Sequence, residues 1–203
     1  MIHPAFRRAA IAAVLLLLSV PCLAEIQHLG VDSAHSTVRF SVRHLVSRVH
    51  GTFSGFEGVV HIDPADPAGT LSFSGEVQVS TVDTGNAKRD KHLQNEDFFD
   101  SEHHRVMRFQ SGEVRQTDHG LDVDGLFTMM GVTQTVTFQV EVLGFMPDPW
   151  GRGTTGGFSA TTTLDRKAFG MAWNTTLDTG GLVLGDEVQV HLQIEAVTLP
   201  ETE

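Results

Sequence analysis

The dominant pattern in this chain is strict alternation of apolar and polar residues, the period of a β-strand with one face toward a core. It begins after Ser36, where Val38, Phe40 and Val42 alternate with polar residues. Five further runs share this alternation, at 71–79, 121–127, 136–142, 158–164 and 188–196. Two weaker candidates, at 51–63 and 107–113, bring the expected number of strands to about eight.

Turn-forming residues separate these runs, and no repeated crossover helix lies between them. The turn clusters are at 63–67, 118–120 and 147–157. Alternation with one polar face indicates antiparallel pairing, and many short strands indicate an all-β barrel or sandwich. Periodicity alone does not separate these two architectures. A barrel removes exposed sheet edges, whereas a sandwich protects its edges by other means.

One segment, 80–100 (STVDTGNAKRDKHLQNEDFFD), interrupts the strand pattern. Residues 86–94 are mostly good helix formers with Leu93 as an apolar contact, and Asp83 or Thr84 is a suitable N-cap. We therefore expect one short helix inserted between strands, where it would close one end of a barrel. A second, shorter helical turn is expected at 165–169, because a glycine follows it.

The first 24 residues have the composition of a cleaved export signal. Arg7 and Arg8 precede an apolar run at 11–20 and then a small-residue cleavage site. The apolar run is shorter than the roughly 20 residues that a transmembrane helix needs. We expect residues 1–24 to be removed and residues 25–203 to form one domain.

Composition after export excludes several classes of protein. Cys22 is the only cysteine, so cleavage after Ala24 leaves no disulfide, thiolate nucleophile or cysteine metal ligand. Lipidation of Cys22 is the alternative, but Pro21 stands where bacterial lipoprotein signals have a small residue. The remaining chain carries 12 Lys and Arg against 25 Asp and Glu. This acidity argues against binding nucleic acid or an anionic membrane through net charge.

The inner faces of the expected strands combine small residues with aromatic and thioether side chains. The small residues are Gly75, Gly125, Ala160 and Ala196. The large ones include Phe40, Phe73, Met107, Phe109, Phe127, Met129, Phe138 and Phe158. Phenylalanine and methionine can line an adaptable lipid tunnel, but they also fill ordinary packed cores. From the residues alone, both interpretations stay open.

Polar residues in the inserted helix suggest acid–base chemistry at first sight. Arg89 and His92 share a helix face, whereas Asp90 points elsewhere. A general base also needs a partner and a substrate pocket, which the sequence does not show. We prefer to place these three residues at the polar mouth of a barrel or in capping roles. An enzyme that uses them on a small hydrophobic substrate is the alternative.

No cofactor, metal site or catalytic residue is predicted. Ten histidines remain after residue 24, but they form no HxH or HExxH spacing. The chain also lacks a GxSxG nucleophile elbow, a GxxxxGKS phosphate loop and a paired glycine-rich dinucleotide motif. Solvated or structural histidines are therefore the default interpretation.

An ordered series of motifs extends over residues 31–197. The series consists of DSAHS and FSVRHL (32–45), GTFSGFEG (51–58), TVDTGN with RDKHL and DFF (81–99), GVT (131–133), FGM (169–171) and GDEV (185–188). Together these motifs resemble the YceI-like family of bacterial lipocalin-like proteins that bind polyisoprenoid lipids. The resemblance favours the barrel over the sandwich. It implies an all-β, antiparallel, lipocalin-like barrel of about eight strands with one short helical insertion.

The resemblance also implies a function. The expected protein is a periplasmic, non-enzymatic carrier that holds a polyisoprenoid or isoprenoid-quinone-like amphiphile for transport, storage or sequestration. The residues expected to line its tunnel are Phe40, Val42, Phe73, Leu93, Phe98, Phe99, Met107, Phe109, Phe127, Met129, Phe138, Phe158 and Met171. Homologous barrels often pair, so a homodimer is compatible with the resemblance. The remaining alternative is a solid barrel that serves a structural role or a membrane electron-transfer partner.

Overall fold

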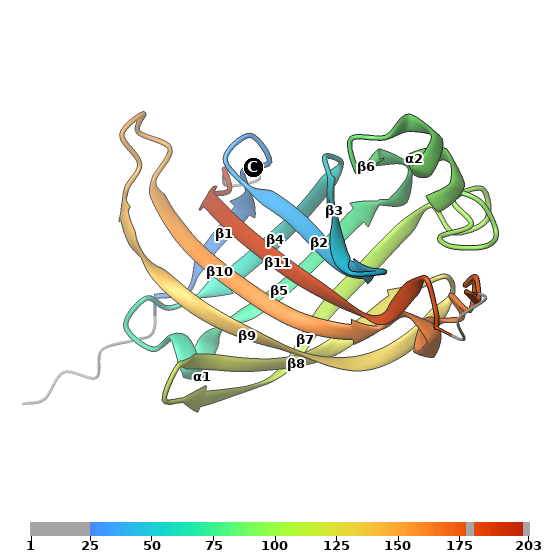
Figure 1. The fold of residues 1–203 in the computed structure, drawn as a ribbon. Coiled ribbons are helices and arrows are strands. Elements are labelled where there is room, and N and C mark those ends of the chain that lie inside the picture. Colours follow the sequence, from blue (N-terminus) through green and yellow to red (C-terminus); the bar gives the residue numbers. More distant parts are fainter. Residues whose placement is uncertain (1–24, 178–180, 201–203) are drawn as a thin grey trace, which may run out of the picture.

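The computed structural model describes residues 25–177 and 181–200, which fold into one closed antiparallel sheet (Figure 1). Its strands are β1 (Gln27–Val31), β2 (Thr37–His44), β3 (Ser47–Phe53), β4 (Phe56–Ile62), β5 (Ser72–Gln78), β6 (Val82–Asp83), β7 (Val106–Thr117), β8 (Gly120–Met129), β9 (Val132–Pro147), β10 (Thr154–Asp165) and β11 (Leu184–Thr198). The expected leader, 1–24, lies outside the described residues. No helix within the described part of the chain has the length and apolar character needed to cross a membrane.

The barrel wall consists of eight strand positions, here called staves, some of which are occupied by two successive strands. This confirms the expected fold class. The strand order is β1-β4-β5-β7-β8-β9-β10-β11, and β11 pairs back to β1. The three remaining strands continue existing staves: β2 pairs with β11 beyond β1, β3 with β2, and β6 with β3. Three staves are therefore interrupted, at 32–36, 54–55 and 79–81. Eight long staves become eleven shorter strands in this way.

Alternation along the strands places one face inside the barrel, as the sequence predicts. On β11, Val190 and Leu192 pair with Phe40 and Val38 of β2, so apolar side chains lie next to one another across the strands. The alternation missed β1, whose five residues are too few to give a clear period. It also merged β3 and β4 into one weak run, although the buried positions shift from odd (Gly51, Phe53) to even (Val60, Ile62) across the break at 54–55.

The inserted helix, α2 (Ala87–Leu93), confirms the helix expected at 86–94. Its N-cap is Asn86, whose side chain accepts a hydrogen bond from the Arg89 amide at 3.1 Å. Asp83 and Thr84 are therefore not the cap. Asp83 instead accepts from the Gly85 amide at 2.7 Å, and this local turn delays the start of the helix.

Three shorter helical segments complete the fold. They are α1 (Pro67–Thr70), the 3₁₀ helix η1 (Val79–Thr81) and the 3₁₀ helix η2 (Arg166–Phe169). The last confirms the helical turn expected at 165–169, and it ends at Gly170 with φ of 93°. The side chain of Asp165 caps η2 by accepting from the Lys167 amide at 2.9 Å.

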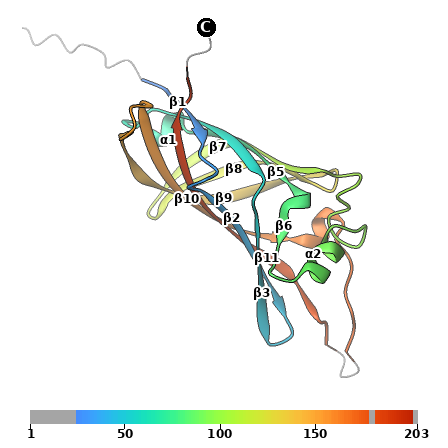
Figure 2. The same cartoon turned by 90° about the horizontal axis from the view of Figure 1, so that it is seen from above.

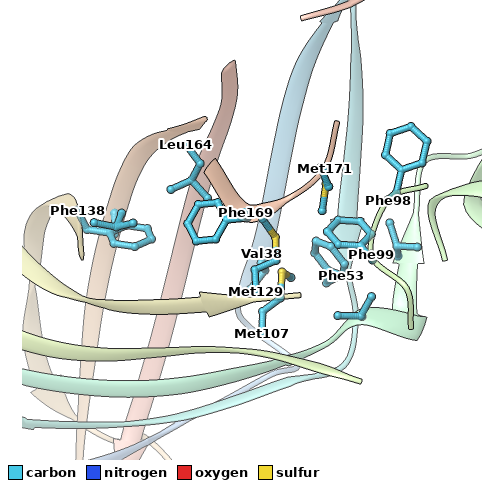
Figure 3. Packing of buried hydrophobic residues seen from close by; sticks show 14 residues of the cluster. Val38, Phe53, Phe98, Phe99, Met107, Met129, Phe138, Leu164, Phe169 and Met171 are labelled. Carbon is cyan, nitrogen blue, oxygen red and sulfur yellow. The ribbon is translucent and has the colours of Figure 1, made fainter. Parts of the chain in front are cut away.

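The buried apolar residues form two clusters. The larger cluster lies at the α2 end and includes Phe53, Phe98, Phe99, Met107, Met129 and Met171 (Figure 3). The smaller cluster lies at the other end and includes Leu29, Val60, Ile62, Leu71 and Leu121. Half-buried apolar residues such as Phe109 and Val140 contact both clusters. The interior is therefore apolar from one end to the other.

Candidate functional site

An apolar cavity with a volume of about 340 Å³ lies inside the barrel. Its wall includes Phe53 and Met171 of the larger cluster and Val60 and Leu71 of the smaller one. It therefore runs along the barrel and is not confined to one end. Its volume falls within the range of small-molecule sites. A completely filled barrel, one of the alternatives from the sequence, does not describe this interior.

All thirteen residues expected to line a tunnel lie on the cavity wall. They are Phe40, Val42, Phe73, Leu93, Phe98, Phe99, Met107, Phe109, Phe127, Met129, Phe138, Phe158 and Met171. They come from six strands, from the segment that contains α2, and from the segment after η2. Their contact with a ligand stays a prediction.

Four of the phenylalanines expected to line the tunnel are only half-buried, although they lie on the inner face. They are Phe40, Phe73, Phe109 and Phe127. Phe138 and Phe158 on neighbouring strands are buried. Because the half-buried rings line the cavity, their accessible surface faces the empty interior. This apolar surface is available to a ligand.

Two glycines of the wall lie directly beneath two of these rings. A Cβ atom added to Gly51 would lie 2.4 Å from the Phe40 ring, and one added to Gly125 would lie 2.3 Å from the Phe109 ring. Gly125 is one of the small inward residues noted in the sequence, and in the structure the Phe109 ring occupies the space above it.

An aromatic group closes the α2 end of the barrel. The rings of His92, Phe98 and Trp173 lie 5.0–5.2 Å apart, centroid to centroid. Phe99 packs edge-on against Phe53 at 5.7 Å, and Figure 3 shows these two rings beside Met171. Residues from α2, the segment after it and the segment after η2 therefore form a lid over the cavity.

A buried arginine fixes the second half of this lid. Arg166 is 2% exposed and donates hydrogen bonds to the carbonyl oxygens of Met171 (2.6 Å), Trp173 (2.9 Å) and Gly185 (2.9 Å). It also contacts the Asp186 carboxylate at 3.1 Å. Hydrogen bonds from Lys167, and the charge of Arg166, lower the pKa of Asp186. Arg166 thus satisfies carbonyl groups that no strand pairs and fixes the position of Trp173.

Of the three polar residues expected at the mouth, the structure places two at the cavity and one away from it. Arg89 and His92 border the cavity, whereas Asp90 does not. Asp90 accepts a hydrogen bond from the Thr84 amide at 2.9 Å, and Arg89 donates to the Thr84 carbonyl at 2.8 Å. His92 contacts Asp97 at 2.9 Å. The Thr84 contacts hold α2 against the end of β6, and the His92 contact joins α2 to the segment that follows it.

Sequence reasoning missed several lining residues. Val190 and Leu192 lie on β11, the strand with the clearest alternation, so their inner position was already visible in the pattern. Phe53 occurs in the weakly alternating run at 51–63. Trp173 and Arg166 follow no strand period, and no signal in the sequence places them at the cavity.

One cluster of possible metal ligands occurs within the described residues, outside the cavity. Asp32, His35 and Glu195 offer ligand atoms within 4.8 Å of one another. His35 contacts Asp32 at 3.1 Å, and this hydrogen bond lowers the pKa of Asp32 and raises that of His35. Arg152 also lies 3.6 Å from Asp32. His35 and Arg152 thus both pair with the half-buried Asp32.

Comparison with known proteins gives a consistent result. The sequence profile of the YceI-like domain matches residues 30–196. A UPF0312 protein of Staphylococcus epidermidis is 34% identical over 165 residues, which is 81% of this chain and 94% of the relative. The crystal structure of BcnA from Burkholderia cenocepacia superposes with a TM-score of 0.71 at 25% identity, covering 81% of this chain and 98% of BcnA.

A more distant solved structure shares the fold alone. It is a polyisoprenoid binding domain from Saccharophagus degradans, implicated in plant cell wall breakdown, with a TM-score of 0.61 at 13% identity. The match covers 86% of this chain and all of that domain. The profile match and the close relatives cover most of the barrel, including the segment with α2. The chain belongs to the YceI-like family.

Proposed function

We propose that this protein binds a polyisoprenoid or isoprenoid-quinone-like amphiphile in the barrel cavity and carries, stores or sequesters it in the periplasm. The apolar cavity of about 340 Å³ is the observation that carries the proposal. The polyisoprenoid binding domain of S. degradans, which has the same fold, supports the choice of ligand class.

The chemistry of the wall fits a long hydrocarbon tail. Each buried methylene contributes about 0.8 kcal/mol, so a tail that spans both clusters gains affinity without specific polar contacts. The tail would lie along Phe73, Phe109 and Phe127, whose rings already face the empty interior. Selectivity among tails of similar length would be weak, because dispersion and hydrophobic contacts are not directional.

The head group would lie at the α2 end. Arg89 and His92 border the cavity there, and the His92 ring lies next to the ring of Trp173. A tail buried in the barrel with a polar end beside Arg89 satisfies both parts of an amphiphile. Polar groups on the cavity border therefore suit an amphiphile better than a plain hydrocarbon.

Two substitutions on β11 test the cavity directly. Val190→Trp adds a large ring on the inner face, and we expect it to abolish uptake of a long-chain ubiquinone. His191→Trp makes the same addition on the exposed outer face and should leave uptake unchanged. Uptake is measured by native mass spectrometry of protein incubated with the quinone in detergent. Equal uptake of the quinone by both folded variants would contradict the proposal.

The native ligand can be sought without assuming its identity. Protein purified from its own cells is extracted with organic solvent, and the extract is analysed for isoprenoid lipids. We expect a species with an isoprenoid tail at a substantial fraction of the protein concentration. A protein that is empty on purification and also fails to take up ubiquinone or polyprenol in vitro contradicts the proposed ligand class.

Catalysis on a small hydrophobic substrate is the second candidate. Arg89, Asp90 and His92 would act there, but each already makes the structural hydrogen bonds described above. Those contacts favour a binding protein. Turnover of a candidate substrate that disappears in Arg89→Gln and His92→Gln variants that still take up ubiquinone would favour the enzyme instead.

Location and assembly belong to the same proposal. Export depends on the leader expected at 1–24, and cell fractionation tests it. A homodimer stays a prediction that light scattering of the purified protein tests. Delivery to a membrane electron-transfer partner also stays a prediction, which quinone exchange with isolated membranes would test.

A further inference from the structure

The β2–β3 hairpin ends in an exposed apolar tip. Leu45 and Val46 form its two-residue turn, and Val46 is fully exposed. Leu45 has a φ of 52°, a left-handed conformation that glycine or asparagine adopts more easily. The turn conformation at Leu45 therefore gives no reason for an apolar residue at this position.

A second apolar segment lies beside this tip. The Leu45 amide donates a hydrogen bond to the Val183 carbonyl at 2.9 Å, which joins the hairpin to the segment between η2 and β11. Leu177 and Leu182 on that segment are exposed. Figure 2 shows the hairpin and this orange-red segment projecting from the α2 side of the barrel. We call Leu45, Val46, Leu177 and Leu182 the apolar rim.

The strands and the segment that carry the rim also line the cavity. Val42 and Val49 face each other across β2 and β3, and both line the cavity, as do Trp173 and Val183. The rim therefore lies next to the cavity mouth, with the His44–Ser47 pair between the tip and the Val42–Val49 pair. An occupant of the rim would lie directly next to the place where a ligand enters.

The hairpin is basic, although the protein is acidic. Residues 37–53 contain three arginines and two histidines but no Asp or Glu. The other residues from 25 onward hold nine Lys and Arg against 25 Asp and Glu. The acidic net charge thus conceals a local positive patch next to the rim.

The arginines of this patch are available to a partner. Arg43 and Arg48 lie opposite each other on the two strands, and both are exposed. Like charges in this position destabilise a strand pair. Their hydrogen bonds go to the Leu45 carbonyl (3.1 Å) and the Ser41 hydroxyl (3.2 Å), and no carboxylate of the described residues lies within ion-pair distance of either. An anionic surface would relieve this repulsion.

We propose that the apolar rim and the arginines behind it dock the protein on an anionic lipid bilayer, with the cavity mouth facing the membrane. The inference rests on the proposed function, since it describes how an amphiphile would enter. Arg43 and Arg48 lie two residues behind the tip, about 7 Å at the rise of a β-strand. This spacing lets Leu45 and Val46 enter the acyl boundary while the arginines reach lipid phosphates.

The opposite end of the barrel provides a matched comparison. The turn between β9 and β10 carries Trp150, which is 71% exposed, so it offers more apolar surface than Leu45. Its arginine, Arg152, is already paired with Asp148 at 2.9 Å and lies 3.6 Å from Asp32. Of these two exposed apolar sites, the described residues place arginines without a carboxylate partner beside the hairpin tip, whereas Arg152 beside Trp150 is paired.

Flotation with lipid vesicles tests the proposal. The vesicles are phosphatidylcholine alone or phosphatidylcholine mixed with phosphatidylglycerol. We expect the protein to float with the anionic vesicles. Leu45→Asn combined with Val46→Gly keeps a turn-forming sequence at the tip but removes the apolar pair. Both this variant and Arg43→Gln with Arg48→Gln should bind at least about tenfold more weakly.

Trp150→Ser is the control and should float like the parent protein. All four proteins share every other residue, so differences report the changed positions alone. A parent protein that stays with the buffer overturns docking, and so do hairpin variants that float unchanged or a Trp150→Ser variant that loses binding.

Uptake of ubiquinone from detergent micelles separates this inference from the proposed function. Uptake without hairpin-dependent flotation overturns docking and leaves the function standing. Hairpin-dependent flotation without any uptake supports docking and overturns the function.

Discussion

The ring of Phe40 lies over Gly51, its partner across β2 and β3, so closely that a Cβ at Gly51 would be 2.4 Å from the ring. The other nearby atom is the Thr84 methyl group at 3.0 Å, so no backbone atom blocks the added carbon. A side chain at Gly51 therefore displaces the Phe40 ring, which lines the cavity.

Gly51→Ala should lower the affinity for a long-chain quinone while the barrel stays folded. If the displaced ring excludes two methylenes of the tail, binding loses about 1.6 kcal/mol, somewhat more than tenfold. Titration with a quinone in detergent measures the change. Gly112→Ala is the control, because its added Cβ meets nothing nearer than the Asp124 carbonyl oxygen at 3.5 Å. An unchanged affinity in folded Gly51→Ala contradicts this account.

Arg166→Met should destabilise the protein by about 3 kcal/mol, because buried carbonyl groups of the lid lose their donor. Urea unfolding followed by circular dichroism measures the loss. Lys167→Met is the control: it removes an exposed contact to Asp186 and should cost less than about 1 kcal/mol. Similar losses in both variants would show that the burial of Arg166 does not determine how much it contributes to the free energy of unfolding.

Trp173 should report ligand entry. The chain has two tryptophans, Trp150 at the exposed β9–β10 turn and Trp173 on the cavity wall. A Trp150→Phe variant should change its fluorescence when a long-chain quinone is added, because the quinone displaces water beside Trp173. A Trp173→Phe variant should not respond. A response that comes only from Trp150 would place the ligand outside the barrel.

Acid should weaken the outer wall of the barrel at Asp124. Hydrogen bonds from Arg115, and then from Thr137, lower the pKa of Asp124 to about 2. Because this pKa lies below the unfolded value, the pair stabilises the fold above about pH 4, and its contribution is lost as the pH falls toward about 2.

Asp124→Asn should accordingly reduce the pH dependence of unfolding in this window, measured by urea unfolding at several pH values. Glu141→Gln changes an exposed carboxylate on β9 and should leave the pH dependence as in the parent protein. A parent-like pH profile for Asp124→Asn would mean that its pair with Arg115 has no measurable effect on stability.

Alternation alone determined most of the strands and the faces they bury. Val190 and Leu192 face inward because a strand sends every second side chain to the same side, whatever its partners are. The inserted helix was also visible, because Asn86 to Gln94 combines helix-forming residues with a break in the strand period. These features depend on short-range geometry, which the order of residues specifies.

Tertiary structure decided what the interior contains. No local pattern states that the Phe40 ring occupies the space above Gly51, because the contact depends on the register of two strands. Arg166 joins the Trp173 carbonyl to Gly185 of β11 only in the folded chain, and the hairpin of Arg43 lies beside Val183 only there. The sequence determined which surfaces are apolar, and the closure of the barrel decided which of them pack, which line a cavity and which face outward.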